Sequence, residues 1–568
     1  MTIKPLLNER KSVLKRDLIA GLTLFVMLIP QGMAYAMLAG LPPVMGLYAS
    51  TIPLFVYALL GSSKHLSVGP TAITSLLVFS GVSVYADPGS SSYISLVVTL
   101  AMMAGIIQVS FGLLKLGFIV KFIPQSVMNG YTSAAAIVIA ISQLKHLLGI
   151  DLGNYLQVHL LIIEIFQKTN DIHFLTFILG VFCILLLLVM KKWTPRIPSA
   201  LVVVIITIAS VMFFRLEAQE ITIVGSVPRG FPAFAFPSLS IDTIQMLVPM
   251  AFTIALLGFM ESLAIGKEVA RKEKYEIHPN KEFRALGLSN IIGSLFGAFP
   301  VNGSFSRTAV NYQTGGATQL AAVITGCFVM LTLVFFTSVF YYLPNAALAA
   351  IIIVAVYKLI DIKEMKYLFK VNAFEGWIWV ATFLITLFVG IQWGIIMGAV
   401  FTLVLIIKKS AKPSIVQLGF VEKEKTFRDI SRYSEAITAD EVVLLRIDSS
   451  LHFANISFLE EKVKRILTNK STQWLIIEMS GVNDIDTVSI QRLEELIDFN
   501  RTMGVTILFA NMKGSVRDTV NKVGWKSKYK EQQNHLTIDQ LLKEKGLHSY
   551  FTSEYVTKPN KWVNDFSI

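Results

Sequence analysis

Two short polar segments, at 66–75 and 299–308, interrupt sequence that is otherwise almost entirely apolar. The first contains Gly69 and Pro70, and the second contains Asn302-Gly-Ser-Phe-Ser. An unpaired backbone N–H or C=O in hydrocarbon costs several kcal/mol, so non-helical backbone is stable there only inside protein or beside a cavity. Two such breaks at matching places in two halves of a chain are typical of a transporter's binding site. The alternative is a pair of packing turns.

Each break is expected to open a half-helix, whose free N–H groups and positive dipole end would point into the protein. Two such ends that converge form a site for an anion. Hydroxyl side chains at the breaks add further donors. The residues that we expect to bind the anion at these two ends are Thr71, Ala72, Ser304, Phe305 and Ser306.

Two charged residues lie in the same apolar surroundings. Arg307 directly follows the second break, and Glu261 lies in Leu257-Gly-Phe-Met-Glu-Ser-Leu-Ala. A charge inside the membrane costs roughly 2.5 to 3.5 kcal/mol, so each usually has a partner and marks function. The planar guanidinium of Arg307 suits an oxyanion. Glu261 is titratable, and a bound anion would favour its protonated form, so anion and proton would bind together. The alternative is a purely structural Glu–Arg ion pair.

A further pair of candidates lies in the first apolar stretch, which contains Ile29-Pro-Gln-Gly-Met-Ala-Tyr-Ala. Pro30 removes a backbone donor, and Gln31 and Tyr35 lie four residues apart, on one face of a helix. We expect both side chains to face the binding site. The alternative is a proline kink with Tyr35 at the membrane interface, which its mid-span position disfavours.

The composition indicates what positions these residues. Of the 568 residues, 54% are hydrophobic and only 15% are charged, whereas about 25% charged residues are usual in soluble domains. Apolar runs long enough to cross a bilayer repeat from about residue 17 to residue 407. We therefore predict a transmembrane domain over 1–410, a linker over 411–438, a soluble domain over 439–550 and a tail over 551–568.

The apolar runs divide into two sets of seven. An odd number per half places the second half on the opposite side of the membrane, so the repeats are expected to be inverted. The predicted spans are 17–37, 43–60, 71–86, 94–114, 119–143, 174–191, 197–215, 244–266, 282–298, 304–317, 319–340, 343–361, 373–390 and 391–408.

The net charge of +12 follows the same pattern, because basic residues gather beside the apolar runs. With fourteen spans and a cytoplasmic N-terminus, every cluster falls on the cytoplasmic side of a plasma or inner membrane, and the C-terminus lies there too. This placement argues against nucleic-acid binding. The clusters are Arg10, Lys11, Lys15 and Arg16; Lys191, Lys192 and Arg196; Lys267, Arg271, Lys272 and Lys274; Lys358, Lys363, Lys366 and Lys370; and Lys408, Lys409 and Lys412.

Several chemistries have no support in the sequence. Cys183 and Cys327 lie in apolar runs and are expected to pack as small hydrophobic residues rather than to form a disulfide. No histidine or cysteine spacing suits a metal, and no Walker A motif is present, so we expect no cofactor and no enzymatic activity.

The C-terminal part alternates strand and helix patterns. Short runs rich in β-branched residues occur at 442–447, 474–479 and 505–509, with helical patterns at 456–468, 488–502 and 514–523. This alternation predicts a small α/β domain.

Taken together, these motifs resemble the sulfate permease (SulP) family. The matching segments are Pro30-Gln-Gly-Met-Ala-Tyr-Ala, Ala39-Gly-Leu-Pro-Pro-Val-Met-Gly-Leu-Tyr, Phe299-Pro-Val-Asn-Gly-Ser-Phe-Ser-Arg and Leu343-Pro-Asn-Ala-Ala-Leu-Ala-Ala. The C-terminal part, with Ser450-Leu-His-Phe-Ala-Asn and Asp484-Ile-Asp-Thr-Val-Ser, resembles a STAS domain. The resemblance implies a core domain that moves against a gate domain, homodimers, and a site containing Tyr35, Glu261, Ser306 and Arg307.

Two departures from the family pattern refine this expectation. Sodium-coupled bicarbonate members have an aspartate and, four residues later, a threonine, whereas this chain has Glu261 and Ile265, which disfavours a sodium site. Related STAS proteins carry two hydroxyl residues after the motif aspartate, whereas this chain has Thr487 followed by Val488. Docking of a cytoplasmic protein partner is therefore favoured over phosphoregulation.

The expected function is proton-coupled sulfate symport by alternating access, with Glu261 carrying the proton. The alternatives are a bicarbonate or dicarboxylate transporter of the same fold, with sodium coupling disfavoured, and a passive anion channel or a membrane scaffold. Arg307 disfavours an uncharged substrate such as a nucleobase.

Overall fold

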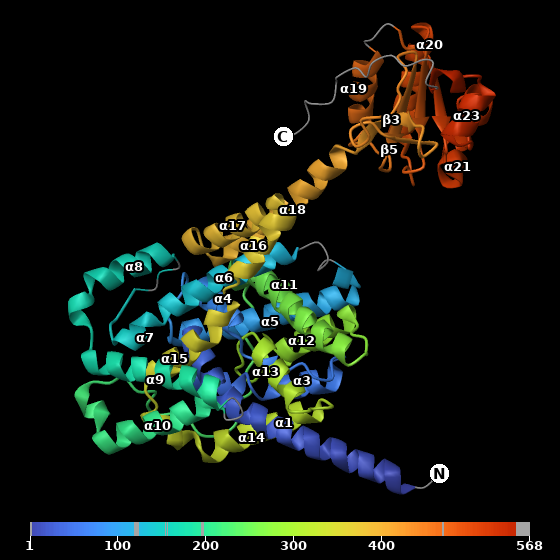
Figure 1. Cartoon of the computed structure of the whole chain (residues 1–568). Helices are drawn as coiled ribbons and strands as arrows, with labels where there is room; N and C mark the ends of the chain where they lie inside the picture. The colour runs from blue at the N-terminus through green and yellow to red at the C-terminus, as the bar shows by residue number, and fades with distance from the viewer. Residues whose placement is uncertain are drawn as a thin grey trace. The chain divides into compact units, whose positions relative to one another are not determined.

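The computed structural model describes residues 3–118, 124–153, 155, 157–194, 198–467 and 471–551. Except for Phe551, the predicted C-terminal tail lies outside these residues, as do the first residues of the predicted spans 119–143 and 197–215. The chain divides into two compact units, Met1–Thr402 and Leu403–Ile568 (Figure 1).

The first unit is helical apart from one short strand pair. Eight of its described helical stretches are long and apolar enough to cross a membrane, and five more apolar helices are 10–17 residues long. Its α-helices, with the last one continuing into the second unit, are α1 (Ile3–Leu38), α2 (Pro43–Tyr48), α3 (Ile52–Leu60), α4 (Ala72–Val82), α5 (Ser91–Leu113), α6 (Gln125–Ser142), α7 (Leu144–Leu148), α8 (Val158–Gln167), α9 (Phe174–Trp193), α10 (Ser199–Phe214), α11 (Ile241–Lys272), α12 (Pro279–Ser294), α13 (Phe305–Gln313), α14 (Leu320–Phe335), α15 (Asn345–Val356), α16 (Ile362–Val371), α17 (Ala373–Phe388) and α18 (Ile391–Ala411).

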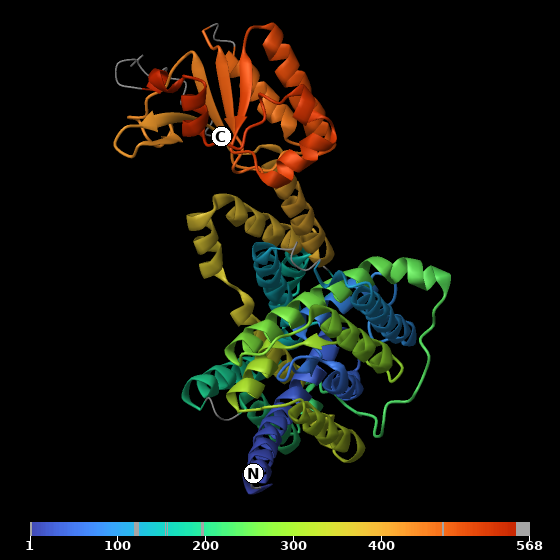
Figure 2. The same ribbon diagram turned by 90° about the vertical axis from the view of Figure 1, so that its right-hand side faces the viewer.

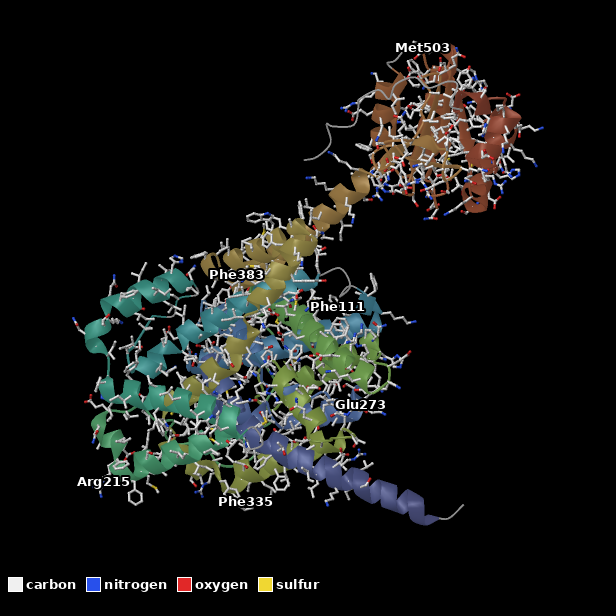
Figure 3. The ribbon with its side chains drawn as sticks, in the orientation of Figure 1. Phe111, Arg215, Glu273, Phe335, Phe383 and Met503 are labelled. Carbon is white, nitrogen blue, oxygen red and sulfur yellow. The ribbon has the colours of Figure 1, made fainter. Side chains whose placement is uncertain are left out.

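Close backbone approach fixes several helix pairs. A Cβ atom at Gly287 of α12 would lie 2.6 Å from the carbonyl oxygen of Gly105 on α5, so both positions need the smallest residue. The ring of Phe111, which Figure 3 labels, makes edge-to-face contacts with Phe252 of α11 and Phe283 of α12 at centroid distances of 5.9 and 5.8 Å. These contacts hold α5, α11 and α12 together as one packed group.

Apart from the five-residue α7, two helices, α8 and α16, do not match any predicted span. Both are short, and α16 has three lysines on its exposed side, so neither gives the long apolar signal of a spanning helix.

The prediction for the two cysteines is right only in part. Both are free thiols, but Cys183 is buried and Cys327 is exposed.

The second unit is an α/β domain (Figure 2). Its sheet has the strand order β4-β3-β5-β6-β7, in which β3 pairs antiparallel with both β4 and β5 while the other neighbours are parallel. The strands are β3 (Ile415–Val421), β4 (Thr426–Asp429), β5 (Val442–Ile447), β6 (Trp474–Glu478) and β7 (Thr506–Ala510).

Helices cover both faces of this sheet. Alternate residues of β5 point to opposite sides, so Leu445 packs in one core cluster and Leu444 in another. The first cluster contains residues of α19 (Ile456–Leu467), α20 (Thr487–Thr502) and α21 (Gly514–Lys522), together with the buried Trp525 of α22 (Trp525–Lys528), and the second contains residues of α23 (Ile538–Glu544) and Phe551 of η6 (His548–Phe551).

The stretch 411–438 differs from the expected linker. It contains β3 and β4, and β3 pairs with β5 over Ile415–Leu418. The strand β4 was not predicted because it is only four residues long and none of them is buried, so it lacks an apolar alternation. The sheet therefore begins soon after α18 ends.

Candidate functional site

The two predicted breaks lie side by side. They form a two-stranded antiparallel pair, β1 (Val68–Gly69) with β2 (Asn302–Gly303), in which Val68 faces Gly303 and Gly69 faces Asn302. The backbone N–H of Ser304 also donates to the carbonyl oxygen of Ser67 at 3.0 Å. This pairing satisfies the backbone groups that a broken helix would leave unpaired, and it brings the start of α4 next to the start of α13.

Both half-helices begin without a side-chain cap. Thr71 and Ser304 are the N-cap residues of α4 and α13, yet neither side chain accepts a bond from its own helix backbone. Instead, the Thr71 hydroxyl donates to Thr74 at 3.0 Å, and the Ser304 hydroxyl lies 3.4 Å from that of Ser306. The first-turn N–H groups of the two helices are therefore left for another partner.

Arg307 lies in the first turn of α13 and is completely buried. Its Nη1 donates to the carbonyl oxygen of Pro70 at 2.9 Å, but Nε and Nη2 are buried without a partner among the described residues. A Cβ atom at Gly69 would lie 3.2 Å from Nη2, so glycine leaves room for the guanidinium. A buried charge with unused donors is costly unless an anion completes its hydrogen bonds.

Glu261 lies on α11 and is half-buried. It forms no ion pair with Arg307, whose one bonded nitrogen donates to the Pro70 carbonyl and whose other two nitrogens have no partner among the described residues. The proposed structural Glu–Arg pair is therefore absent from this structure. Glu261 forms no hydrogen bond in the described part of the chain either, so its carboxyl group is available to exchange a proton.

The remaining predicted residues differ in their exposure. Gln31 and Tyr35 are buried on α1, and Oε1 of Gln31 has no partner among the described residues. The helix α1 packs against α13, which carries Arg307. Phe305 is 52% exposed, and Ser306 is exposed as well. Thr71, Ala72 and Ser304 are buried.

The residues that hold β2 in place were not predicted from the sequence. Nδ2 of Asn302 donates to the Thr74 hydroxyl of α4, and the N–H of Gly303 donates to the Ser262 hydroxyl of α11 at 2.8 Å. A Cβ atom at Gly258 would overlap the Asn302 side chain, so only glycine fits there. The break is therefore attached to α4 and α11, which carries Glu261 one residue before Ser262.

A second set of buried amides supports the same segment. Oδ1 of Asn290 accepts the N–H of Val301 at 2.8 Å, and Nδ2 of Asn290 donates to the Val301 carbonyl at 3.2 Å and to Gln108 Oε1 at 3.0 Å. Gln108 in turn donates to the Ala255 carbonyl of α11 at 3.2 Å. The signal was present in the sequence, since a lone amide in an apolar span usually has a polar partner.

A metal site is not found near these residues. The described residues contain no group of three or more histidine, cysteine, aspartate or glutamate side chains able to hold a metal ion. Four residues after Glu261, Ile265 is buried and offers no oxygen ligand.

The Asp484-Ile-Asp motif of the second unit serves a structural purpose. Asp486 is the N-cap of α20, and its carboxylate accepts the N–H of Ser489 at 2.8 Å and of Phe453 at 2.7 Å. Val488 stands where related STAS proteins carry their second hydroxyl residue, and its side chain is 45% exposed. The motif thus joins the loop after β5 to the start of α20.

Family models match both units of the chain. The model described as the sulfate permease family matches residues 14–382, and the STAS domain model matches residues 433–538. The chain is 37% identical over 527 residues to "Sulfate transporter 4.1, chloroplastic" of Arabidopsis thaliana, covering 90% of this chain and 77% of that one. It is 33% identical over 473 residues to human "Solute carrier family 26 member 6", covering 79% and 62% of the two chains.

Solved structures give the same result. The structure described as the overall structure of SLC26A9 matches with a TM-score of 0.86 and 25% identity, covering 97% of this chain and 91% of that chain. The transmembrane domain of a cyanobacterium bicarbonate transporter, BicA, matches with a TM-score of 0.60 and 25% identity, covering 68% and 97%.

The chain thus combines a multi-pass membrane domain, in which two half-helices meet at a buried arginine, with matches to family models over most of its length. It belongs to the sulfate permease family of anion transporters and carries a C-terminal STAS domain.

Proposed function

We propose that this chain is a proton-coupled sulfate symporter that works by alternating access. The observation that supports it most is the guanidinium of Arg307, which is buried at the start of α13 and has two nitrogens without a partner, and no carboxylate partner, among the residues that the structure describes. A tetrahedral dianion can accept several charge-assisted hydrogen bonds at once, which suits these donors and the uncapped N–H groups of α4 and α13.

The proposed division of roles follows the geometry. Arg307 supplies the fixed positive charge, and the anion is bound by Thr71, Ala72, Ser304, Phe305 and Ser306 through hydroxyls and backbone N–H groups. Gln31 and Tyr35 line the α1 side of the site. Glu261 takes up the proton, since the negative charge of a bound sulfate favours the neutral carboxylic acid over the carboxylate.

The surrounding architecture completes the proposal. We infer fourteen spans arranged as two inverted seven-span repeats, with core and gate domains that move against each other around the site. The chain would form homodimers in a plasma or inner membrane with both termini in the cytoplasm, where the STAS domain would contact a protein partner.

Uptake of labelled sulfate into proteoliposomes tests this proposal. An inward proton gradient should increase the initial rate for the wild type, and Glu261→Gln should remove the dependence on the gradient while sulfate exchange continues. Gradient-driven uptake that is unchanged in Glu261→Gln would exclude Glu261 as the proton carrier.

Bicarbonate is the second candidate substrate, because the membrane domain also resembles that of BicA. A bicarbonate or dicarboxylate ion could use the same half-helix ends, although the buried Ile265 disfavours the coupling to sodium. Unlabelled bicarbonate, a dicarboxylate and sulfate should be compared as competitors of labelled sulfate. Electrical conductance without coupled proton movement would instead indicate a passive channel.

A further inference from the structure

Two lysines come close together at one end of the membrane domain, far from the Arg307 site in the sequence. Nζ of Lys191, at the end of α9, lies 5.1 Å from the centroid of the Tyr357 ring. Lys358 directly follows Tyr357 in the 3₁₀ helix η5 (Tyr357–Leu359), so Lys191 packs against the residue next to Lys358. Two ammonium groups at close range repel each other unless an anion lies between them.

The segment that carries Lys358 is held in place. The Ser133 hydroxyl of α6 donates to the Leu359 carbonyl at 3.2 Å and accepts the N–H of Asp361 at 3.1 Å. The helices α9 and α15 also pack against each other just before this point. Packing therefore fixes the backbone that carries the two lysines, while both of their side chains are exposed.

Carboxylates lie near this region, but within the described residues none of them forms an ion pair with its lysines. The Asp361 carboxylate caps α16 by accepting the N–H of Glu364 at 2.9 Å, and Glu375 accepts Nδ2 of Asn372 at 3.1 Å. We call six lysines of this region the basic face: Lys191, Lys192, Lys358, Lys363, Lys366 and Lys370. Within the described residues, none of them forms an ion pair.

The aromatic residues around the basic face indicate its depth in the membrane. Trp and Tyr side chains gather where the acyl region meets the headgroups. Four such side chains are well exposed here, Trp193 at 76%, Tyr357 at 47%, Tyr367 at 60% and Trp377 at 64%. The lysines therefore lie at the level of lipid headgroups.

The helix α16 extends the basic face along this level. Leu368 is its buried contact with the protein, and Lys363, Lys366 and Lys370 lie on the exposed side at helical spacing. Exposed apolar residues, Ile362 and Val371, flank the lysines. A helix with this pattern lies in the plane of the interface.

We propose that the basic face binds the phosphate of an anionic phospholipid, with Lys191 and Lys358 as the two groups that hold it. The phosphate bridges the two ammonium groups, and the acyl chains lie against the exposed apolar and aromatic residues. Retention of membrane orientation by positive charge would explain lysines scattered at this surface, but not the packing of Lys191 against the ring of Tyr357, the residue directly before Lys358.

Native mass spectrometry of the full-length chain in detergent tests the proposal. The wild type is titrated with dioleoylphosphatidylglycerol, with dioleoylphosphatidylcholine and with inorganic phosphate. We expect bound phosphatidylglycerol and little of the other two. The Lys191→Gln/Lys358→Gln variant should bind phosphatidylglycerol roughly ten- to thirtyfold more weakly, since each lysine near an anionic surface adds a fewfold to the affinity.

Two further variants make the result specific. Lys267→Gln/Lys272→Gln removes the same charge from α11 and should bind phosphatidylglycerol as the wild type does, and Lys191→Arg/Lys358→Arg should retain binding. Equal weakening by the α11 variant, or no weakening in Lys191→Gln/Lys358→Gln when its melting temperature matches the wild type, would overturn the proposal. Displacement of the lipid by inorganic phosphate at similar concentrations would assign the site to free phosphate instead.

Discussion

Nη1 of Arg307 donates a hydrogen bond to the carbonyl oxygen of Pro70 at 2.9 Å, across 237 positions of the sequence. The bond ties the first turn of α13 to the residue two positions before α4 begins. The same guanidinium retains Nε and Nη2 for another partner. One side chain thus fixes the distance between the two half-helices and offers charge at their junction.

Arg307→Lys should separate charge from geometry. The ammonium group keeps the positive charge, but it cannot reach Pro70 and present a planar pair of donors to an anion at the same time. Loss of one charge-assisted hydrogen bond should lower kcat/KM for sulfate uptake by about ten- to a hundredfold. Initial uptake rates in proteoliposomes measure this, with Arg284→Lys, at an exposed position of α12, as the control. An uptake rate in Arg307→Lys equal to that of the wild type would contradict the role of the planar guanidinium donors.

Gly258→Ala should disturb the site although alanine favours helices. The added methyl would overlap the Asn302 side chain, so β2 would have to shift away from α4 and α11. Sulfate uptake should fall at least tenfold, because small displacements of a binding group cost about this much.

Gly266→Ala on the same helix is the matched control. Its methyl would meet only the tip of the Ile277 side chain, at 2.8 Å, and that tip can rotate away. The control should therefore transport sulfate at nearly the wild-type rate. Equal rates for the two variants would mean that the fit of Asn302 against α11 does not matter.

Asn290→Ala should weaken both the fold and the site. It leaves the N–H and C=O of Val301 unpaired in a buried position, at about 1–3 kcal/mol for each group. Gln108→Leu leaves the two Val301 bonds in place and should cost less. The melting temperature should be lowest for Asn290→Ala, intermediate for Gln108→Leu and highest for the wild type. The KM for sulfate should follow the opposite order, highest for Asn290→Ala and lowest for the wild type. The reverse order would show that α5 rather than the Val301 peptide needs the amide.

The two half-helices could be predicted from the sequence because their signal is local. Glycine, proline and hydroxyl residues stand out in apolar surroundings, and the structure starts α4 at Ala72 and α13 at Phe305, directly after them. Arg307 and Glu261 stand out for the same reason, since a charge is rare in a membrane span.

The partners of these residues could not be predicted, because they come from distant parts of the chain. Nothing local indicates that Arg307 bonds a carbonyl near α4 rather than the Glu261 carboxylate. The short strand β4 and the surface helix α16 were missed for different reasons. The four residues of β4 are too few to show an alternation, and α16 is amphipathic but lacks the long apolar run of a membrane span.

Asp486→Ala tests the STAS motif through its dependence on pH. Burial acts to raise the pKa of Asp486, but hydrogen bonds from the N–H groups of Ser489 and Phe453 outweigh it and hold the pKa below its usual value of 3.8. A lowered pKa in the folded state means that the carboxylate stabilises the domain fully above the unfolded pKa. This stabilisation is lost as the pH falls through the folded pKa.

Calorimetry of the STAS transition in the full-length chain measures the effect. At pH 7, Asp486→Ala should unfold with a free energy lower by about 1–2 kcal/mol, the usual contribution of an N-cap. Asp486→Asn, which can still cap α20, should lose less. The gap between the wild type and Asp486→Ala should narrow below about pH 4, where the unfolded aspartate binds a proton. A gap that stayed constant down to pH 3 would mean that the charge of Asp486 contributes nothing, and that the neutral carboxyl group holds Phe453 and Ser489 together equally well.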